Sequence, residues 1–371
     1  MNLRIRETLG RLWVGLLLLG SAAGAAAAEA PMRVGFLAGG DRVNNFWVRM
    51  GEFAQAVADD LGIELEIVYP PPATYPIKRA GERLVERLGD GDYFIAVYFD
   101  AVTHELMEIA ERRGVYTFLI NTDILDKDRP LTGRPRQKYL RWLGHIRPDD
   151  IQAGFLLGRK LIDALEKPET ARIIAINGNT TVQVARDREA GLLKAVADTP
   201  GAKVVAAGMG NWEFDPAKVT TARLLEAHPE ANIVWAASDP MALGALEAVR
   251  SAGRRPGGDV LLGGIDWTYE GLDAVQRGEF VADVGGHFME AGIALILLYD
   301  YHHGHDFAEE LGTSFRTPMY AVDGASIAEH MRKTGKKPDW SKIDFKRFTK
   351  THNPDLERYD FSWQAVIDAL P

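Results

Sequence analysis

Short apolar runs alternate with amphipathic segments along the chain from Met32 onward. The runs MRVGFLA, IELEIVY, YFIAVYFD and VYTFLINTD have the length and β-branched character of strands. The segment 46–61 between the first two has a helical period, with one face made of Phe46, Met50, Phe53, Val57 and Leu61. Continuous apolar runs of this kind are typical of parallel strands covered on both faces. The alternation therefore predicts an α/β fold with doubly wound parallel sheets.

The stretch 232–280 contains one such unit twice. Each copy is an apolar run, IVWAAS and then VLLGGI, that ends near Asp239 or Asp266 and is followed by an amphipathic segment. Because ligands of open α/β sheets bind at the carboxyl ends of the strands, two carboxylates at neighbouring strand ends predict a site for a small polar molecule. The alternative is that each aspartate only caps the following helix. Both roles are compatible.

Length, charge and cysteine content narrow the class of protein. A chain of 371 residues exceeds what one hydrophobic core usually supports, so we expect two domains. The net charge of −9 argues against a nucleic acid partner, because neutralising phosphates requires a basic face. The absence of cysteine excludes a disulfide framework and a lipidated cysteine after a leader.

Residues 1–28 have the pattern of a secretory signal peptide. Arg4, Arg6 and Arg11 precede the apolar run VGLLLLGSAAGAAAA, and the alanines at 26–28 are the small residues that a signal peptidase requires. A membrane anchor is the alternative, but the apolar run is shorter than the roughly 20 residues of a membrane span. We therefore expect a mature chain that begins near Glu29 and is a soluble monomer in the periplasm.

Two segments break the alternation. Residues 124–142 combine a cluster of lysine and arginine with two prolines, and we interpret them as a surface loop near a domain boundary. This loop is either a solvated insertion without function or a contact for a partner. Residues 341–371 are polar and aromatic with little period, and we expect them to wrap over the surface as a C-terminal extension.

Three stretches carry a resemblance to a known family: NNFWVRMGEFAQAVADDLG, SDPMALGALEAVRSAGR and GIDWTYEGLDAVQRGEF. With them, the chain resembles the periplasmic sugar-binding proteins of the ribose-binding type, which are type I periplasmic binding proteins. It is also similar to the periplasmic receptors for autoinducer-2. The resemblance implies two Rossmann-like lobes with parallel doubly wound sheets, joined by a three-strand hinge. The three crossings are expected near 143–146, 283–287 and 319–323. The resulting division is an N-terminal lobe at 29–143 and 287–319, a C-terminal lobe at 144–286 and 320–340, and the extension at 341–371.

The resemblance also implies which residues contact the ligand. They are Asn44, Asn45, Phe46, Trp47, Asp100, Asn121, Arg186, Ser238, Asp239, Asp266 and Trp267. Two positions depart from the family pattern. Gly286 stands beside His287 where ribose binders carry a glutamine, and Trp267 replaces a glycine next to Asp266. Ribose itself is therefore not the expected ligand.

The chemistry of this set suits a sugar. Hydroxyls both donate and accept, so a closed site for them needs carboxylate and amide acceptors, a guanidinium donor and flat aromatic faces. Three carboxylates would face one arginine, Arg186, so an anionic ligand would be repelled and a neutral sugar or polyol is expected. Structural alternatives remain: Trp47 could belong to the core, Arg186 could pair with Asp187 or Glu189, and Asn121 could be a turn residue.

Catalytic motifs are missing from the sequence. There is no GxSxG, HExxH or GxxxxGKS/T, and no GxGxxG after the first strand. The HHGH run at 302–305 has no recognised metal-ligand spacing with its neighbours. We therefore expect a binding protein rather than an enzyme, with neither metal nor cofactor. The resemblance implies delivery of the ligand to an ABC permease. The alternative is a sensory receptor that presents its ligand state to a membrane sensor kinase.

Overall fold

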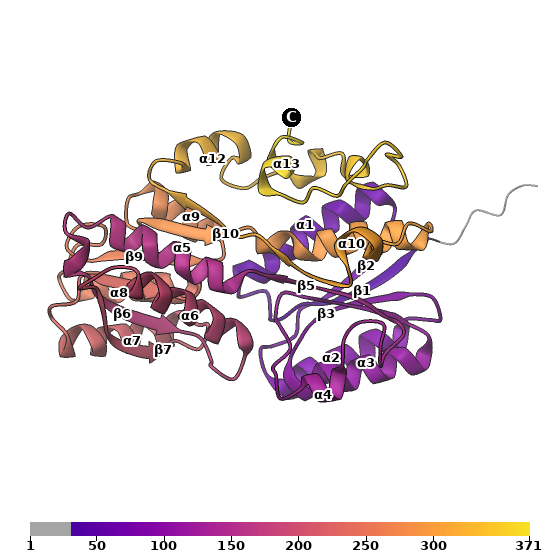
Figure 1. Cartoon of the computed structure of the whole chain (residues 1–371), viewed down its shortest axis with the longest axis horizontal. Helices are drawn as coiled ribbons and strands as arrows, with labels where there is room; N and C mark the ends of the chain where they lie inside the picture. Colours follow the sequence, from indigo (N-terminus) through magenta and orange to yellow (C-terminus); the bar gives the residue numbers. More distant parts are fainter. Residues whose placement is uncertain (1–30) are drawn as a thin grey trace, which may run out of the picture. The chain divides into compact units, whose positions relative to one another are not determined.

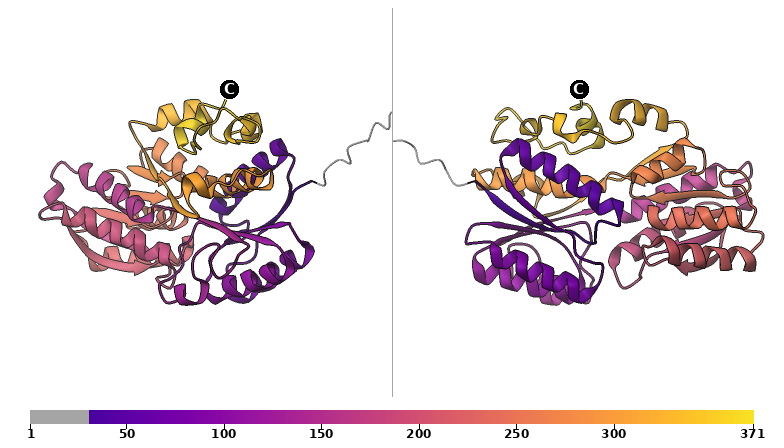
Figure 2. Two further views of the ribbon diagram at one scale, coloured as in Figure 1. Left: turned by 45° about the vertical axis from the view of Figure 1, so that its right-hand side comes forward. Right: turned by 180° about the vertical axis from the view of Figure 1, so that it is seen from behind.

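The computed structural model describes residues 31–371, which form two six-stranded sheets with helices on their faces (Figures 1 and 2). The predicted signal peptide at 1–28 lies outside the described residues. Within the described part of the chain, no helix is long and apolar enough to cross a membrane.

The first sheet is the centre of the N-terminal lobe, and its strands run parallel in the order β11-β5-β4-β3-β1-β2. The strands are β1 (Arg33–Leu37), β2 (Glu64–Val68), β3 (Tyr93–Val97), β4 (Tyr116–Ile120), β5 (Trp142–Pro148) and β11 (Ser314–Thr317). Helices α1 (Asn45–Leu61) and α10 (Glu290–His302) lie on one face, and α2 (Thr74–Arg87) and α3 (Asp100–Arg113) on the other (Figure 1). The apolar face predicted for residues 46–61 is buried beneath α1, which confirms that helix.

The second sheet has the order β12-β10-β9-β8-β6-β7, and only the β10–β12 pair is antiparallel among the pairs of the described sheet. Its strands are β6 (Arg172–Asn177), β7 (Lys203–Met209), β8 (Ile233–Ala236), β9 (Leu261–Ile265), β10 (Ala282–Gly285) and β12 (Tyr320–Asp323). The helices are α5 (Asp150–Asp163), α6 (Gln183–Ala197), α7 (Phe214–Ala227), α8 (Asp239–Ser251) and α9 (Tyr269–Gln276), with a short turn η1 (Pro168–Thr170) before β6.

Helices α5 and α6 pack backbone against backbone. A Cβ added to Gly154 of α5 would lie 1.9 Å from the Arg188 carbonyl oxygen, and one added to Gly191 of α6 would lie 2.1 Å from the Ile151 carbonyl oxygen. Glycine at both positions is required because any side chain would push the helices apart. This close approach fixes which face of α6 turns inward.

The chain crosses between the two lobes three times, as predicted for this fold. The first crossing leads from β5 into α5, the second from β10 through η2 (His287–Met289) into α10, and the third from β11 to β12. The first boundary needs a correction. Strand β5 continues to Pro148 because it pairs with β11 along its whole second half, so residues 144–148 belong to the first sheet and not to the C-terminal lobe.

The C-terminal strap, which we define as residues 324–371, is ordered by aromatic packing rather than by an apolar period. Its elements are α12 (Ile327–Thr334), η3 (Trp340–Lys342), η4 (Phe345–Phe348) and α13 (Trp363–Ile367); α4 (Arg129–Thr132) and α11 (Ala308–Leu311) are further short helices outside it. The Trp340 ring lies 5.3 Å from that of Phe53 on α1. The Trp363 ring lies 5.1 Å from that of Trp267, beside β9. The strap therefore contacts elements of both lobes (Figure 2).

Candidate ligand-binding site

The start of α1 brings four of the predicted residues toward the C-terminal lobe. Asn44 caps the helix, because its Oδ1 accepts a bond from the Phe46 N–H at 3.0 Å. Asn45 Nδ2 donates to Glu270 Oε1 of α9 at 2.7 Å, which joins the two lobes. The Phe46 ring is buried and stacks on His287, with 4.6 Å between the ring centroids. These two side chains therefore already have protein partners.

Two tryptophans lie over glycines at the carboxyl ends of strands, one on each lobe. Trp47 covers Gly39 and Gly40 after β1, where a Cβ on Gly39 would lie 2.2 Å from the Trp47 ring. Trp212 covers Gly178 after β6, where the same test gives 2.0 Å. Both tryptophans are only partly buried. Each lobe thus presents a flat aromatic face at the edge of its sheet, where ligands of this fold bind.

Arg188 of α6 is the charged centre of the C-terminal lobe. Its Nε donates to Asp150 Oδ1 at 2.8 Å, and its Nη1 donates to the Ala237 carbonyl at 2.7 Å and lies 3.4 Å from Asp266 Oδ1. The side chain is only 3% exposed. Burial opposes its charge, but Asp150 and Asp266 outweigh this effect, so the pKa of Arg188 is raised above its ordinary value. Arg188 is therefore a fixed cation.

His287 connects this arginine to the N-terminal lobe. Arg188 Nη2 lies 3.2 Å from Nε2 at the edge of the His287 ring, and the face of the same ring stacks on Phe46. Burial, together with the charges of Arg188 and Arg49, lowers the pKa of His287 well below its usual range. The ring is therefore neutral, and Nε2 accepts from the arginine. The proton then sits on Nδ1, which has no partner in the described structure.

The two predicted strand-end aspartates have different surroundings. Asp266 faces Arg188, and burial raises its pKa to about 6 against the opposing charge of that arginine. Asp239 is fully buried, and its Oδ2 accepts from the Thr268 N–H at 2.7 Å and the Thr268 hydroxyl at 2.8 Å. Burial raises the pKa of Asp239 to about 7. Burial and the neighbouring Asp239 raise the pKa of Asp283 well above its usual range. Asp239 and Asp283 thus form a buried carboxyl pair under α9.

Several predicted site residues lie outside this cluster. Arg186 is exposed, and its Nε donates to the Thr180 carbonyl at 2.7 Å. The family resemblance predicted Arg186 as the guanidinium of the site, but the structure places Arg188 in the buried cluster instead. The two side chains are separated by about 160° around the helix axis. The contact of α6 with α5 buries the face that carries Arg188. Asp100 is exposed and pairs with Lys127 at 2.9 Å.

Three further predicted residues are buried in the interior. The Trp267 ring is 1% exposed, and its Nε1 donates to the Asp283 carbonyl at 3.0 Å, so it supports the C-terminal strap. Ser238 is 3% exposed. Asn121 is 7% exposed and has a φ of 70°, the turn conformation considered as its alternative.

Arg49 was missed as a candidate, although it lies inside the FWVR stretch. It is 1% exposed on α1, and its guanidinium carbon lies 4.2 Å from the Phe288 ring centroid and 5.0 Å from that of Tyr269 on α9. Burial lowers the pKa of Arg49 to about 10. The available signal was its spacing, because Arg49 follows Phe46 by three residues and precedes Phe53 by four on the apolar face.

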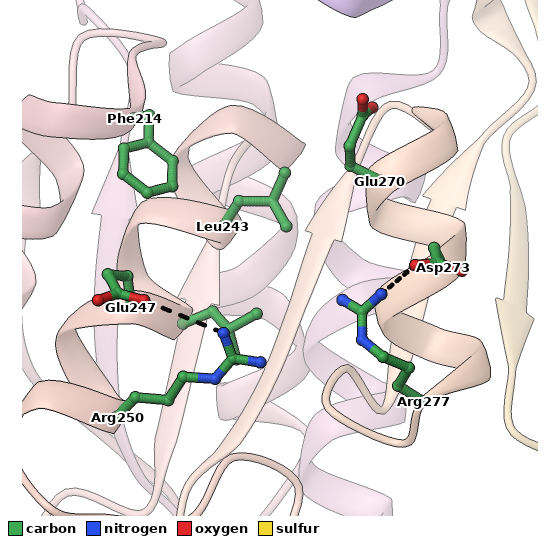
Figure 3. A pocket seen from close by; sticks show the side chains of 8 residues that line it. Phe214, Leu243, Glu247, Arg250, Glu270, Asp273 and Arg277 are labelled. Carbon is green, nitrogen blue, oxygen red and sulfur yellow. Dashed lines mark hydrogen bonds and ion pairs between the residues drawn. The ribbon is translucent and has the colours of Figure 1, made fainter.

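Two hollows lie apart from the Arg188 cluster. One, of about 250 Å³, lies between α8 and α9, where Phe214 and Leu243 form an apolar floor and Arg277 pairs with Asp273 at the rim (Figure 3). The other, of about 400 Å³, lies beneath the loop 124–142. Within residues 31–371, no group of three or more His, Cys, Asp or Glu side chains is arranged to hold a metal ion.

Two α/β lobes with three crossings and polar groups at the strand ends define a two-lobed solute-binding protein. Residues 34–302 match the periplasmic binding protein domain family, and the chain belongs to this family. The predicted family and fold class are thereby confirmed. The family and the relatives of this chain are binding proteins rather than enzymes.

Known relatives bind sugars. The galactofuranose-binding protein of Escherichia coli K12 is 26% identical over 321 residues, which are 85% of this chain and 96% of that protein. The ribose import binding protein of Salmonella typhimurium is 32% identical over 142 residues, 38% of this chain and 46% of that protein. A crystal structure of a periplasmic sugar-binding protein from Pseudomonas fluorescens aligns with a TM-score of 0.80 at 28% identity, covering 91% of this chain and 99% of that one.

Proposed function

We propose that this protein binds a neutral sugar or polyol in the periplasm and delivers it to an ABC permease. The observation that carries the proposal is the fixed Arg188 fork beside Asp266, with a tryptophan face at the strand ends of each lobe. A guanidinium donates to ring and hydroxyl oxygens, a carboxylate accepts from hydroxyls, and aromatic faces cover the C–H faces of a sugar ring. The names of the relatives, which bind galactofuranose and ribose, support the same ligand class.

The charge balance of the cluster supports a neutral ligand. Arg188 is compensated by two carboxyl groups, Asp150 and Asp266, and both have raised pKa values because they are buried. Asp100 is paired with Lys127, and Asp239 is fully buried with a pKa raised to about 7, so neither adds a free carboxylate that faces the ligand. An anion would need an uncompensated cation in this site, and a cation would displace Arg188 from its carboxylates. A polyhydroxyl compound requires neither.

Calorimetric titration against neutral pentoses, hexoses and polyols, with sugar acids, sugar phosphates and amino acids in the same panel, tests the proposal. We expect micromolar or tighter binding of at least one neutral sugar or polyol. Tight binding of only a sugar phosphate or dicarboxylate would overturn the assignment. Export can be tested separately by locating the chain in the periplasmic fraction and sequencing its amino terminus, which we expect near Glu29. Sedimentation of the same material checks the expected monomer.

A further inference from the structure

The loop 124–142 borders an open cavity that the sugar site does not use. The cavity holds about 400 Å³, which is within the usual range for small-molecule pockets. It lies between the loop and the strands β5 and β11, of which β11 is the edge strand of the sheet. Its lining residues are Ile124, Arg129, Gly133, Arg134, Pro135, Trp142, His145, Arg147, Thr313 and Ser314. None of them belongs to the Arg188 cluster.

The lining carries an excess of positive charge. Three arginines line the cavity and no acidic residue does. Asp123 lies behind the wall and pairs with two of them, at 2.8 Å from Arg147 Nε and 3.1 Å from Arg129 Nη2. Asp126 adds a second partner for Arg129 at 3.2 Å. The third arginine, Arg134, has neither a hydrogen bond nor an ion pair from its side chain to any described residue.

Arg134 is unlike the other cations of its loop. Arg136 forms a two-pronged pair with Asp306, Lys127 pairs with Asp100, and Arg141 pairs with Asp90. Lys138, the remaining lysine of the loop, donates to the Leu131 carbonyl. Each of these cations therefore has a protein partner, whereas Arg134 lines the hollow without one. His145 adds no further positive charge at neutral pH, because burial lowers its pKa to about 4. Its Nε2 lies 3.1 Å from the Thr122 carbonyl.

We propose that this cavity is a second binding site, and that its ligand is a small organic anion with a phosphate or carboxylate head group. Arg134 supplies the free guanidinium fork that such oxyanions take up in a bidentate manner. Arg129 and Arg147 hold the adjoining positive charge in place through Asp123, and Ser314 adds a hydroxyl that already contacts Arg147 Nη1 at 2.7 Å. Ile124, Pro135 and Trp142 form an apolar wall for the carbon skeleton.

The proposal is independent of the sugar site. Arg188 and Asp266 lie on the C-terminal lobe, whereas the cavity is lined by β5, by the loop, and by β11 with the preceding Thr313, all in the N-terminal lobe. The loop that the sequence marked as an insertion without function or a partner contact thereby gains a third role, as the cover of an anion site. Loss of the sugar function would leave this site unchanged.

Titration calorimetry of the full mature chain with inorganic phosphate and, separately, with citrate tests the site, at an ionic strength held constant with sodium chloride. We expect saturable binding of at least one probe, and the stronger one identifies the head group. Arg134→Gln, which removes an exposed side chain without partners, should weaken that binding at least tenfold. The matched control is Arg223→Gln on the exposed face of α7, which should leave the affinity within twofold.

Three outcomes would overturn the proposal. The first is no saturable binding of either probe, and the second is equal weakening in Arg134→Gln and Arg223→Gln. The third is loss of anion binding in Arg188→Lys with full binding in Arg134→Gln, which would place the anion in the sugar site. A circular dichroism spectrum and melting curve of Arg134→Gln confirm that the variant is folded before the titration is read.

Discussion

Arg188 Nε donates to Asp150 Oδ1 at 2.8 Å, and neither side chain is more than 6% exposed. Asp150 is the first residue of α5, the helix that directly follows the first crossing, while Arg188 lies on α6. Because this bond uses one edge of the guanidinium, the remaining N–H groups are directed to Ala237, Asp266 and His287. The pair therefore sets the orientation of the donor group at the strand ends.

The first prediction compares the two arginines of α6. Arg188→Lys keeps the charge but loses the planar fork, so we expect ligand affinity to fall at least tenfold, a change that corresponds to about 1.4 kcal/mol. Arg186→Lys changes an exposed side chain whose Nε contacts only the Thr180 carbonyl, and affinity should stay within twofold. Calorimetry with the sugar found in the panel gives both values. Equal losses in the two variants would contradict the assignment of Arg188.

The sequence could predict the fold because its signals are local. Apolar runs and helical periods mark the strands and helices, and Gly39, Gly40 and Gly178 follow strands where a close approach is needed. By contrast, whether an arginine on a helix points into the protein or into solvent depends on which face of the helix packs against its neighbour. The packing of Gly154 and Gly191 between α5 and α6 turns Arg188 inward and leaves Arg186 exposed.

The roles of the tryptophans likewise depend on distant residues. Trp267 follows a predicted strand-end aspartate, and nothing near it in sequence shows that Trp363, almost 100 residues later, covers its ring. The sequence did not single out Trp212, although its ring lies over Gly178. The centroid of this ring is 6.0 Å from the guanidinium carbon of Arg188. Packing between elements far apart in sequence, rather than local pattern, separates a ligand-facing ring from a buried one.

The second prediction concerns the free energy of unfolding as a function of pH. Burial raises the pKa of Glu290 to about 8, and those of Asp150 and Asp239 to about 7. A group whose folded pKa is raised binds more protons in the folded state, so stability is lost as pH rises through that value. The lowered pKa values of His287, His145 and His330 act in the opposite direction, but only below about pH 6.5. Stability should therefore fall from pH 7 to pH 9.

Glu290→Gln isolates one part of this fall. A single group with a pKa of about 8 loses about 1.4 kcal/mol between pH 7 and pH 9, so the variant should show a smaller decrease by about that amount. The control is Glu226→Gln, at an exposed position of α7. Urea unfolding at both pH values measures the difference. A decrease of the same size in Glu290→Gln and wild type would show that Glu290 does not hold a proton at neutral pH.

The third prediction concerns the C-terminal strap. Trp340 is 3% exposed and lies against Phe53 and Phe288, at 5.3 and 5.6 Å between ring centroids. Trp340→Ala should lower the free energy of unfolding by about 3–5 kcal/mol, because it leaves a cavity between the strap and α1. Tyr75→Ala removes a ring that is 71% exposed and should change it by less than about 0.5 kcal/mol. Denaturant unfolding of both variants gives the comparison, and equal effects would mean that the strap packs only loosely.

The last prediction is that the two lobes close on the ligand. The aromatic faces of Trp47 and Trp212 belong to different lobes. Hydrogen bonds between α1 and α9, such as Asn45 to Glu270 at 2.7 Å and Tyr269 to Glu52 at 2.9 Å, join the two lobes. A sugar that contacts both rings binds the closed state more tightly than the open state, because only closure brings the two rings together around it. This difference in affinity shifts the equilibrium between open and closed lobes toward the closed state. Small-angle scattering should therefore show a smaller radius of gyration when the sugar is saturating. Arg188→Lys at the same sugar concentration should show a smaller decrease, because its occupancy is lower. A radius of gyration that is unchanged at saturation in the wild type would show that binding does not require closure, and that one lobe alone holds the ligand.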